Sequence, residues 1–280
     1  MKLSFTKMHG LGNDFVVFDF TRTAYPLSSQ QAAQIADRHF GIGCDQILIV
    51  EKSNKETVDF KYRILNSDGS EVNQCGNGAR CFARFVRERG LSNNNPIVVE
   101  TNAGELSLYS EPNSNQVTVD MGVPRFEPGS VPLVGVEMAD RYSINKDGDA
   151  IEFFAVSMGN PHAVIQVEDV TTAPVSLVGP MLESHPMFPE RTNVGFMQIN
   201  SPSEIALRVF ERGVGETLAC GSGACAAVAC GVQAGLLEQT VSVSLPGGRL
   251  TINWSGGDSS VLMTGPTEVV FEGEIESDNL

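Results

Sequence analysis

One stretch of the chain occurs twice, and this duplication constrains the fold more than any other feature. Residues 63–91 read RILNSDGSEVNQCGNGARCFARFVRERGL, and residues 208–236 read RVFERGVGETLACGSGACAAVACGVQAGL. The two stretches align without a gap at a constant offset (208 − 63 = 145), which places Cys75 on Cys220. Each copy is interpreted as a loop that opens a helix, with a cysteine just before the helix N-terminus. Two such cysteines predict one site made from two halves.

Shorter matches extend the duplication to most of the chain. Gly12-Asn13 matches Gly159-Asn160, each in a glycine-containing turn before an apolar strand. This pattern indicates a duplicated domain rather than an array of short repeats. The boundary is predicted near residues 122–124, which gives domains at 1–122 and 123–265. The tail, residues 266–280, is expected to form a strand that packs back on the first half.

The order of predicted elements is similar in the two halves. In the first half we expect strands at 3–5, 15–20, 46–50 and 60–65, a helix at 28–38, and antiparallel strands after Gly90. The second central helix is apolar on every face, as in a helix wrapped by a sheet. The first carries Arg80, Arg84 and Arg87 along one stripe, which is expected to meet water or carboxylates.

Composition excludes several classes of function. The formal net charge of -15 and the pI near 4.6 argue against a nucleic-acid-binding protein, because few cations are available to neutralise phosphates. No apolar run approaches transmembrane length and no signal-peptide core begins the chain, so a cytoplasmic protein is expected.

The cysteines are predicted to be thiols rather than disulfides, since the chain is long and of cytosolic character. The sequence has no Cys-x-x-Cys pair and no cluster of histidines, so no metal site is expected. The cysteines outside the two matched positions are interpreted as packing residues: Cys44, Cys81, Cys225 and Cys230.

The duplicated loops are suited to proton transfer beside a carboxylate. The positive end of a helix dipole stabilises a thiolate, and the first-turn amides bind an anionic group. For either loop alone, a buried cysteine beside a glycine-rich turn is an alternative interpretation. Two thiols at one site predict abstraction of a proton from the carbon next to a carboxylate by one cysteine, and reprotonation by the other.

The chain resembles the diaminopimelate epimerases over nearly its whole length. The resemblance is carried by MHGLGNDF at 8–15, CDQ at 44–46, the two cysteine motifs, GNPH at 159–162 and RTNVGF at 191–196. It implies an α+β fold of two pseudo-symmetric domains, each a mostly antiparallel sheet curled around a central helix. It also implies a homodimer, for which Phe271 is the expected contact, and cofactor-independent epimerisation of LL-2,6-diaminopimelate to the meso form.

The resemblance also assigns roles to individual residues. Cys75 and Cys220 become the acid/base pair, and His162 and Glu211 become residues that tune the two thiols. Asp14 is interpreted as the cap of a turn, and His9, His39 and His185 as structural or exposed. The residues expected to bind the small amino acid substrate are Asn13, Gln46, Asn66, Gly76, Asn77, Asn160, Asn193, Glu211, Arg212, Gly221 and Ser222.

Three other functions compete with this prediction. A proline or hydroxyproline racemase shares the paired-cysteine chemistry, but it has no use for a polar set that holds a distant amino acid group. An isomerase of the phenazine-biosynthesis type uses carboxylate chemistry, which two intact cysteine motifs argue against. A catalytically silent amino acid-binding protein would not need both motifs complete.

Overall fold

The computed structural model describes residues 1–73, 75–110, 114–146 and 148–277. These residues form eighteen strands and four helices, which confirms the predicted α+β class. The chain divides into two compact units, Met1–Val119 with Gly265–Leu280, and Asp120–Thr264. Over the described residues, none of the helices is long and apolar enough to cross a membrane.

The first unit is a mixed, mostly antiparallel sheet with two helices. Strand β1 pairs with β18 and β2, β2 runs parallel to β3, β3 is antiparallel to β4, and β4 pairs with both β5 and β6. Strands β6, β7 and β8 continue as an antiparallel meander. The bounds are β1 (Lys2–Gly10), β2 (Asn13–Asp19), α1 (Ser29–Ala36), β3 (Gln46–Lys52), β4 (Phe60–Asn66), β5 (Glu71–Val72), α2 (Gly76–Glu88), β6 (Ile97–Thr101), β7 (Gly104–Ser110), β8 (Gln116–Asp120) and β18 (Glu268–Glu276).

The second unit repeats this pairing scheme. Strand β10 pairs with β11, β11 runs parallel to β12, β12 is antiparallel to β13, and β13 pairs with β14 and, in parallel, with β15. Strands β15, β16 and β17 are antiparallel. The bounds are β9 (Tyr142–Lys146), β10 (Asp149–Ser157), β11 (Pro161–Gln166), α3 (Val175–Glu183), β12 (Asn193–Ser201), β13 (Glu204–Glu211), β14 (Gly215–Thr217), α4 (Gly221–Gln233), β15 (Thr240–Leu245), β16 (Gly248–Asn253) and β17 (Leu262–Pro266).

The internal duplication is therefore present in the structure as well as in the sequence. Helices α2 and α4 begin and end at positions that the offset of 145 relates (221 − 76 and 233 − 88). The turns before β2 and β11 also match, because Gly12 and Gly159 have φ of 87° and 86°. That left-handed conformation favours glycine, which explains why both copies carry one there. The predicted pair of pseudo-symmetric domains is confirmed.

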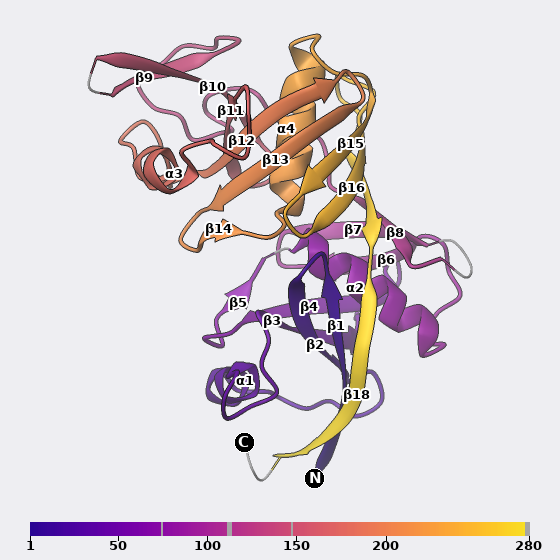
Figure 1. Ribbon diagram of the computed structural model, residues 1–280. Coiled ribbons are helices and arrows are strands. Elements are labelled where there is room, and N and C mark those ends of the chain that lie inside the picture. Colours follow the sequence, from indigo (N-terminus) through magenta and orange to yellow (C-terminus); the bar gives the residue numbers. More distant parts are fainter. Residues whose placement is uncertain (74, 111–113, 147, 278–280) are drawn as a thin grey trace. The chain divides into compact units, whose positions relative to one another are not determined.

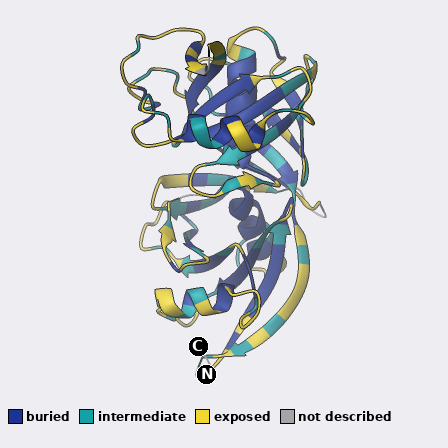
Figure 2. Ribbon diagram, turned by 60° about the vertical axis from the view of Figure 1, so that its left-hand side comes forward, coloured by how far each residue is buried: buried dark blue, intermediate teal, exposed yellow. Residues whose placement is uncertain are grey.

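Each sheet curls around its central helix. Helix α2 packs against β1, β2, β3 and β7, and α4 packs against β10, β11, β12, β13 and β16, so each helix meets strands from distant parts of its sheet. Figure 1 shows both helices among the strands of their own units, and Figure 2 shows that both are largely buried. The apolar α4 matches its prediction, since nearly every residue from Gly221 to Gly231 is buried.

The arginines of the α2 stripe differ in their exposure. Arg84 meets carboxylates as predicted, with Nε 2.8 Å from Glu88 and a guanidinium nitrogen 3.7 Å from Glu268. Arg80, in contrast, is completely buried at 0% exposure, so it does not meet water. The unbranched side chain of arginine lets its apolar stem pack inside a helix–sheet core, which a charge pattern alone does not reveal.

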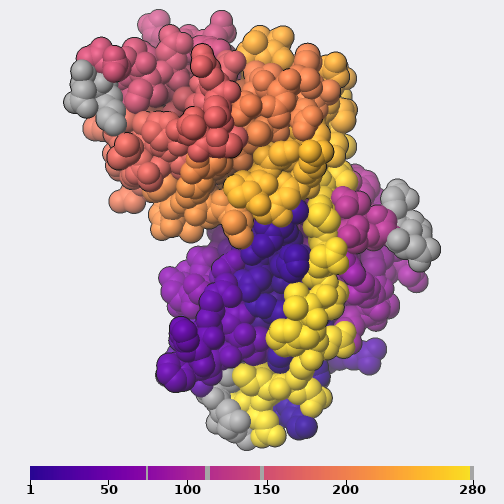
Figure 3. All heavy atoms as spheres, in the orientation of Figure 1, coloured from indigo at the N-terminus to yellow at the C-terminus, as the bar shows by residue number. Residues whose placement is uncertain are grey.

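Two elements of the second unit, α3 and β9, add to the predicted set. Helix α3 corresponds in order to α1, but Gly179 and Pro180 interrupt its helical pattern in the sequence. Strand β9 extends the sheet next to β10. The tail forms β18, which pairs with β1 from Lys2↔Glu276 onwards and lies along the surface of the first unit (Figure 3).

Candidate active site

In the first unit, the candidate site begins with Cys75 at the N-terminus of α2. Cys75 is the N-cap residue in extended conformation, and its half-buried Sγ accepts a hydrogen bond of 3.4 Å from the amide of Gly78. An amide in the first turn has no intrahelical acceptor, so it is available to a sulfur or a bound anion. The predicted placement of this cysteine just before the helix is confirmed.

Close packing fixes the first turn of α2. A Cβ at Gly78 would lie 2.4 Å from Oη of Tyr62, so only glycine fits there. The Tyr62 hydroxyl donates to the carbonyl oxygen of Cys75 at 3.4 Å. Burial, followed by the nearby Cys75, raises the pKa of Tyr62 well above its ordinary value, so the phenol stays neutral. Sequence reasoning missed Tyr62, which lies on β4 with no motif around it.

Strand topology brings three predicted residues to one edge of the first sheet. Parallel strands β2 and β3 begin with Asn13 and Gln46, while antiparallel β4 ends with Asn66. Nε2 of Gln46 donates to Oδ1 of Asn66 at 3.0 Å, and Asn66 in turn donates to Oγ of Ser70 at 3.1 Å. The buried Oε1 of Gln46 has no hydrogen-bond partner among the described residues, which leaves an acceptor at this edge.

Asn13 links this edge to the cysteine loop. Its Oδ1 lies 3.9 Å from Sγ of Cys75 and 3.4 Å from Nδ2 of Asn77. The structure therefore groups the predicted residues Asn13, Asn77 and Cys75, and it places Gln46 and Asn66 beside each other on neighbouring strands.

Behind Asn13 lies a group of charged residues that the sequence did not identify as functional: Lys7, Asp14, Arg38 and Asp45, called here the charge cluster. Asp14 is 2.6 Å from Lys7 and 2.8 Å from Arg38, and Arg38 is also 2.8 Å from Asp45. Burial by itself raises the pKa of Asp14, but the hydrogen bonds and charges of Arg38 and Lys7 outweigh it and hold the pKa of that carboxyl well below its usual range. Asp14 is thus an ion-pair partner, and its Oδ1 also accepts a hydrogen bond of 2.9 Å from the backbone N–H of Asp45.

In the second unit, Cys220 occupies the equivalent place at the N-terminus of α4. It is the N-cap residue, it is 4% exposed, and its Sγ lies 3.7 Å from Oγ of Ser222. Burial, and then the negative charge of Glu211, raise the pKa of the Cys220 thiol well above its ordinary value. This cysteine is therefore a thiol at neutral pH.

Glu211 is the last residue of β13, and in the internal alignment it matches Asn66 of the first unit. It accepts a hydrogen bond from the Cys220 thiol and one of 2.5 Å from Oγ1 of Thr217 on β14. Burial raises the pKa of Glu211 above its usual value. Thr217 is a second contact that sequence reasoning missed, although it lies within the matched block.

Asn160 and Ser222 link His162 to the second cysteine. Its Nε2 lies 3.0 Å from Oδ1 of Asn160, whose Nδ2 donates to Oγ of Ser222 at 3.4 Å. Burial, and then the charge of Arg212, lower the pKa of His162 to about 3. The imidazole is neutral at physiological pH and donates from Nε2, so it orients Asn160 without adding charge.

The remaining predicted residues of this unit differ in exposure. Asn193 is 3% exposed, and its amide bridges the carbonyl oxygen of Pro161 and the backbone N–H of Arg212. Arg212 has an exposed side chain, which donates to the carbonyl oxygen of Glu190 at 3.0 Å. An exposed guanidinium next to a buried carboxylate can bind a carboxylate while Glu211 accepts from an ammonium group.

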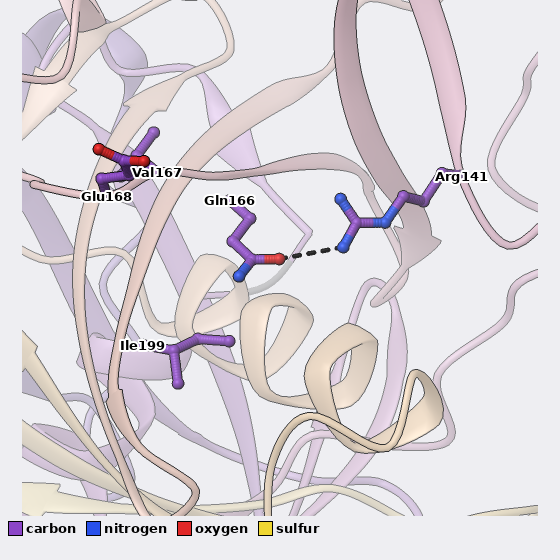
Figure 4. Close-up of a pocket in the computed structure, with 5 residues that line it drawn as sticks. All are labelled: Arg141, Gln166, Val167, Glu168 and Ile199. Carbon is purple, nitrogen blue, oxygen red and sulfur yellow. Dashed lines mark hydrogen bonds between the residues drawn. The ribbon is translucent and has the colours of Figure 1, made fainter.

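A separate hollow in the second unit is lined by residues that the sequence did not single out. Figure 4 shows Arg141 donating to Oε1 of Gln166 at 3.0 Å, near Val167, Glu168 and Ile199. The Arg141 guanidinium also stacks over the ring of Phe154, 4.3 Å from its centroid. Arg141 and Gln166 therefore satisfy each other in this hollow.

The four cysteines predicted to pack are buried: Cys44, Cys81, Cys225 and Cys230. All six cysteines are thiols in the structure. Burial raises the pKa of Cys44 and Cys81 to about 12, so these two are not thiolates at neutral pH.

Known proteins resemble this chain along most of its length. The family model described as "Diaminopimelate epimerase" matches residues 5–127 and 154–270. A diaminopimelate epimerase from Thioalkalivibrio sulfidiphilus is 56% identical over 278 residues, covering 99% of this chain and all of that protein. Proteins of the same name from Nitrosomonas europaea and Teredinibacter turnerae are 56% and 53% identical over 276 residues, with the same coverage.

Solved structures share the fold at low sequence identity. A hydroxyproline epimerase from Agrobacterium vitis superposes with a TM-score of 0.71 at 15% identity, covering 99% of this chain and 93% of that one. A phenazine biosynthesis protein of the PhzF family from Enterococcus faecalis gives a TM-score of 0.72 at 14% identity, covering 99% and 100%. At such identities the likeness concerns the fold alone, whereas the full-length relatives identify the family. The family inferred from the motifs is confirmed, and the chain belongs to the diaminopimelate epimerase family of isomerases.

Proposed function

We propose that the protein interconverts LL- and meso-2,6-diaminopimelate with Cys75 and Cys220 as a two-base pair. The observation that carries the proposal is the repeated placement of a cysteine at the N-cap of a central helix, once in each unit. Each loop supplies a sulfur together with first-turn amides, and the relatives named above are diaminopimelate epimerases over the full length of this chain.

In the proposed reaction, one cysteine acts as thiolate and removes the proton from the α-carbon. The C–H bond breaks, an S–H bond forms, and the electron pair remains on the carbon next to the carboxylate. The other cysteine, as thiol, gives its proton to the opposite face of that carbon and becomes a thiolate. The two sulfurs have then exchanged protonation states, and the configuration at the carbon is inverted.

The first-turn amides stabilise the charge that develops during proton removal. As the carbanion forms, negative charge moves into the adjacent carboxylate, and the backbone N–H groups at Gly76-Asn77 and Gly221-Ser222 are donors suited to it. Preorganised donors of this kind supply the stabilisation that an electron-sink cofactor would otherwise provide, so the proposed reaction needs no cofactor.

The second amino acid centre of the substrate is held by polar side chains in this proposal. Arg212 grips its carboxylate, Glu211 accepts from its ammonium group, and amide side chains complete the contacts. Glu211 also accepts a hydrogen bond from Cys220, so the same carboxylate both binds the substrate and affects the protonation of the thiol. The amide side chains assigned to substrate binding are Asn13, Gln46, Asn66, Asn160 and Asn193.

The proposal extends to assembly and location. Phe271 and Val270 lie on β18 with 47% and 56% of their surfaces exposed, and such apolar side chains on a surface strand support a homodimer contact there. Sedimentation as a monomer at micromolar concentration would remove this part. We propose that the reaction serves lysine and cell-wall precursor synthesis, and a role in such synthesis supports a cytoplasmic location.

Isotope exchange tests the reaction and both bases together. Wild-type enzyme incubated with LL-diaminopimelate in heavy water should form the meso isomer and incorporate deuterium at the α-carbon. Cys75→Ala and Cys220→Ala should each lower epimerisation by at least about 1,000-fold, because each removes one of two obligatory proton carriers. Cys44→Ala is the matched control, since this buried thiol takes no part. Near-normal turnover in either single active-site variant would refute the two-base reaction.

A further inference from the structure

We propose that Asp45 is a positioning residue, which fixes the side-chain amide of Asn13 so that its carbonyl oxygen faces Cys75. The remaining members of the charge cluster hold Asp45 in place. The inference deepens the proposed function and rests on the catalytic role proposed for Cys75. All of the residues involved lie in the first unit.

The orientation of the Asn13 amide follows from the chemistry of its neighbour. Oδ2 of Asp45 lies 2.9 Å from Nδ2 of Asn13 and accepts its hydrogen bond. A carboxylate is an acceptor only, so the NH2 end of the amide must point toward Asp45. The carbonyl end then points the other way, where Oδ1 meets Sγ of Cys75 at 3.9 Å. Nδ2 of Asn77 donates to the same oxygen at 3.4 Å and favours the same orientation, but Asp45 makes the shorter contact and the one to a charged group.

The charge cluster fixes Asp45 from two sides. Oδ2 of Asp45 also accepts from the backbone N–H of Asp14 at 3.1 Å, and the Asp45 N–H donates back to Oδ1 of Asp14 at 2.9 Å. Arg38 bridges the two carboxylates at 2.8 Å from each. Two neighbouring carboxylates repel each other, and Arg38 and the buried Lys7 offset that repulsion.

The fold itself does not require these charges. The parallel register pairs Phe15 with Gln46 in the first unit and His162 with Asn193 in the second. The counterparts of Asp14 and Asp45 in this scheme are therefore Pro161 and Thr192, which are both uncharged. Because the second unit builds the same strand arrangement with uncharged residues at these two positions, the strand pairing does not require the two carboxylates.

A fixed carbonyl oxygen has a definite effect on a cysteine. An acceptor facing sulfur favours the S–H form and disfavours the thiolate, whereas an N–H group would do the opposite. The Asn13 oxygen that Asp45 fixes therefore counteracts the amide of Gly78, which donates to the same sulfur and favours the thiolate. The balance keeps the proton on Cys75 available for delivery and still allows its removal. Release of Asn13 should shift this balance toward the thiolate, which is alkylated faster but has no proton to deliver.

Two variants of Asp45 distinguish the effect of the hydrogen bond to Asn13 from the effect of the negative charge of Asp45. Asp45→Ala removes the acceptor, so kcat should fall about 10- to 100-fold, as for a misplaced catalytic contact. Alkylation of Cys75 by iodoacetamide at fixed pH, followed by peptide mass spectrometry, should become about three- to tenfold faster. Asp45→Asn loses the charge but keeps an oxygen that can accept from Asn13, so kcat and alkylation rate should both lie within about threefold of wild type.

Controls exclude a general effect of charge or folding. Glu56→Ala removes an exposed negative charge from the same unit and should change neither quantity. Arg38→Gln leaves the Asn13–Asp45 bond in place but loosens Asp45, so it should shift both quantities in the direction of Asp45→Ala by a smaller factor. It provides the test if Asp45→Ala does not fold.

The outcomes distinguish this inference from the proposed function. The inference is overturned if Asp45→Ala folds with wild-type kcat and wild-type Cys75 alkylation, or if Asp45→Asn is as impaired as Asp45→Ala. If Arg38→Gln has to stand in, unchanged values in that variant overturn it. Full activity of Cys75→Ala would instead refute the proposed function.

Discussion

The two cysteine loops have the same backbone frame but different surroundings, and the difference is chemical. In the first unit, Cys75 is half-buried and faces an amide oxygen fixed by an exposed carboxylate. In the second unit, Cys220 is buried beside the carboxylate of Glu211, whose negative charge raises the pKa of the thiol. A duplicated frame therefore presents two unlike proton carriers, which suits a reaction that needs one acid and one base at a time.

The asymmetry extends to the asparagines that match across the duplication. Asn13 turns its NH2 end toward Asp45 and its oxygen toward Cys75. Asn160 has the reverse arrangement: Nε2–H of His162 donates to its oxygen, and its NH2 end donates to Oγ of Ser222. One half-site thus offers an acceptor and the other a donor. A substrate with both ammonium and carboxylate groups needs both kinds.

The largest expected effect comes from making the second cysteine more like the first. Glu211→Gln removes the carboxylate that accepts from Cys220, so kcat should fall about 100-fold or more, as when a proton-transfer partner is lost. The negative charge of Glu211 raises the pKa of Cys220, and the variant should therefore lower that pKa. The pH dependence of kcat, measured by formation of the meso isomer, should shift toward lower pH.

Glu216→Gln is the matched control for this variant. Glu216 lies on the adjoining strand and pairs with Arg208 at 2.6 Å, outside the cysteine loop. Its replacement should leave kcat within about twofold, in line with the small worth of ion pairs at the surface. A Glu211→Gln enzyme with the kcat and pH profile of wild type would show that the carboxylate does not act on Cys220.

A smaller effect concerns the neutral imidazole of the second unit. The pKa of His162 is about 3 in the folded protein against an ordinary 6.5, so below pH 6.5 the unfolded chain binds a proton that the folded chain does not. Stability that is present above pH 6.5 is therefore lost as the pH falls toward 3. The loss should be about 1.4 kcal/mol for each pH unit within that range.

Urea unfolding at pH 7.5, 6 and 5 measures this dependence. His162→Gln has no titrating imidazole and should show a flatter decline of the unfolding free energy than wild type. His39→Gln, which changes an exposed histidine, should retain the wild-type slope. Identical slopes for wild type and His162→Gln would contradict the buried, neutral state of His162.

Much of this arrangement was predictable because the sequence repeats itself. The match of Cys75 with Cys220 located both helix N-termini, and the apolar pattern of 224–232 predicted a buried helix. The charge cluster was not predictable, because its four members are separated in sequence and meet only through the β2–β3 register and the turn after α1. Asp45 lay within a recognised motif, but the motif does not show what its carboxylate contacts.

Helix α3 shows a different limit. The duplication implied a counterpart of α1 between β11 and β12, but Gly179 and Pro180 have poor helix propensity and hid the pattern. In the fold, Phe210 lies against Gly179, whose added Cβ would be 2.7 Å from the ring. Close packing thus explains a residue that local propensity disfavours.

Mild oxidation tests most directly whether the two cysteine loops form one site. Two thiols that serve the same carbon must approach each other closely, so an oxidant should join Cys75 to Cys220 and abolish epimerisation, with recovery on reduction. Peptide mass spectrometry of the inactive enzyme should then find the Cys75–Cys220 linkage, and Cys75→Ala should lack it. Inactivated enzyme in which these two cysteines are not linked would contradict the account.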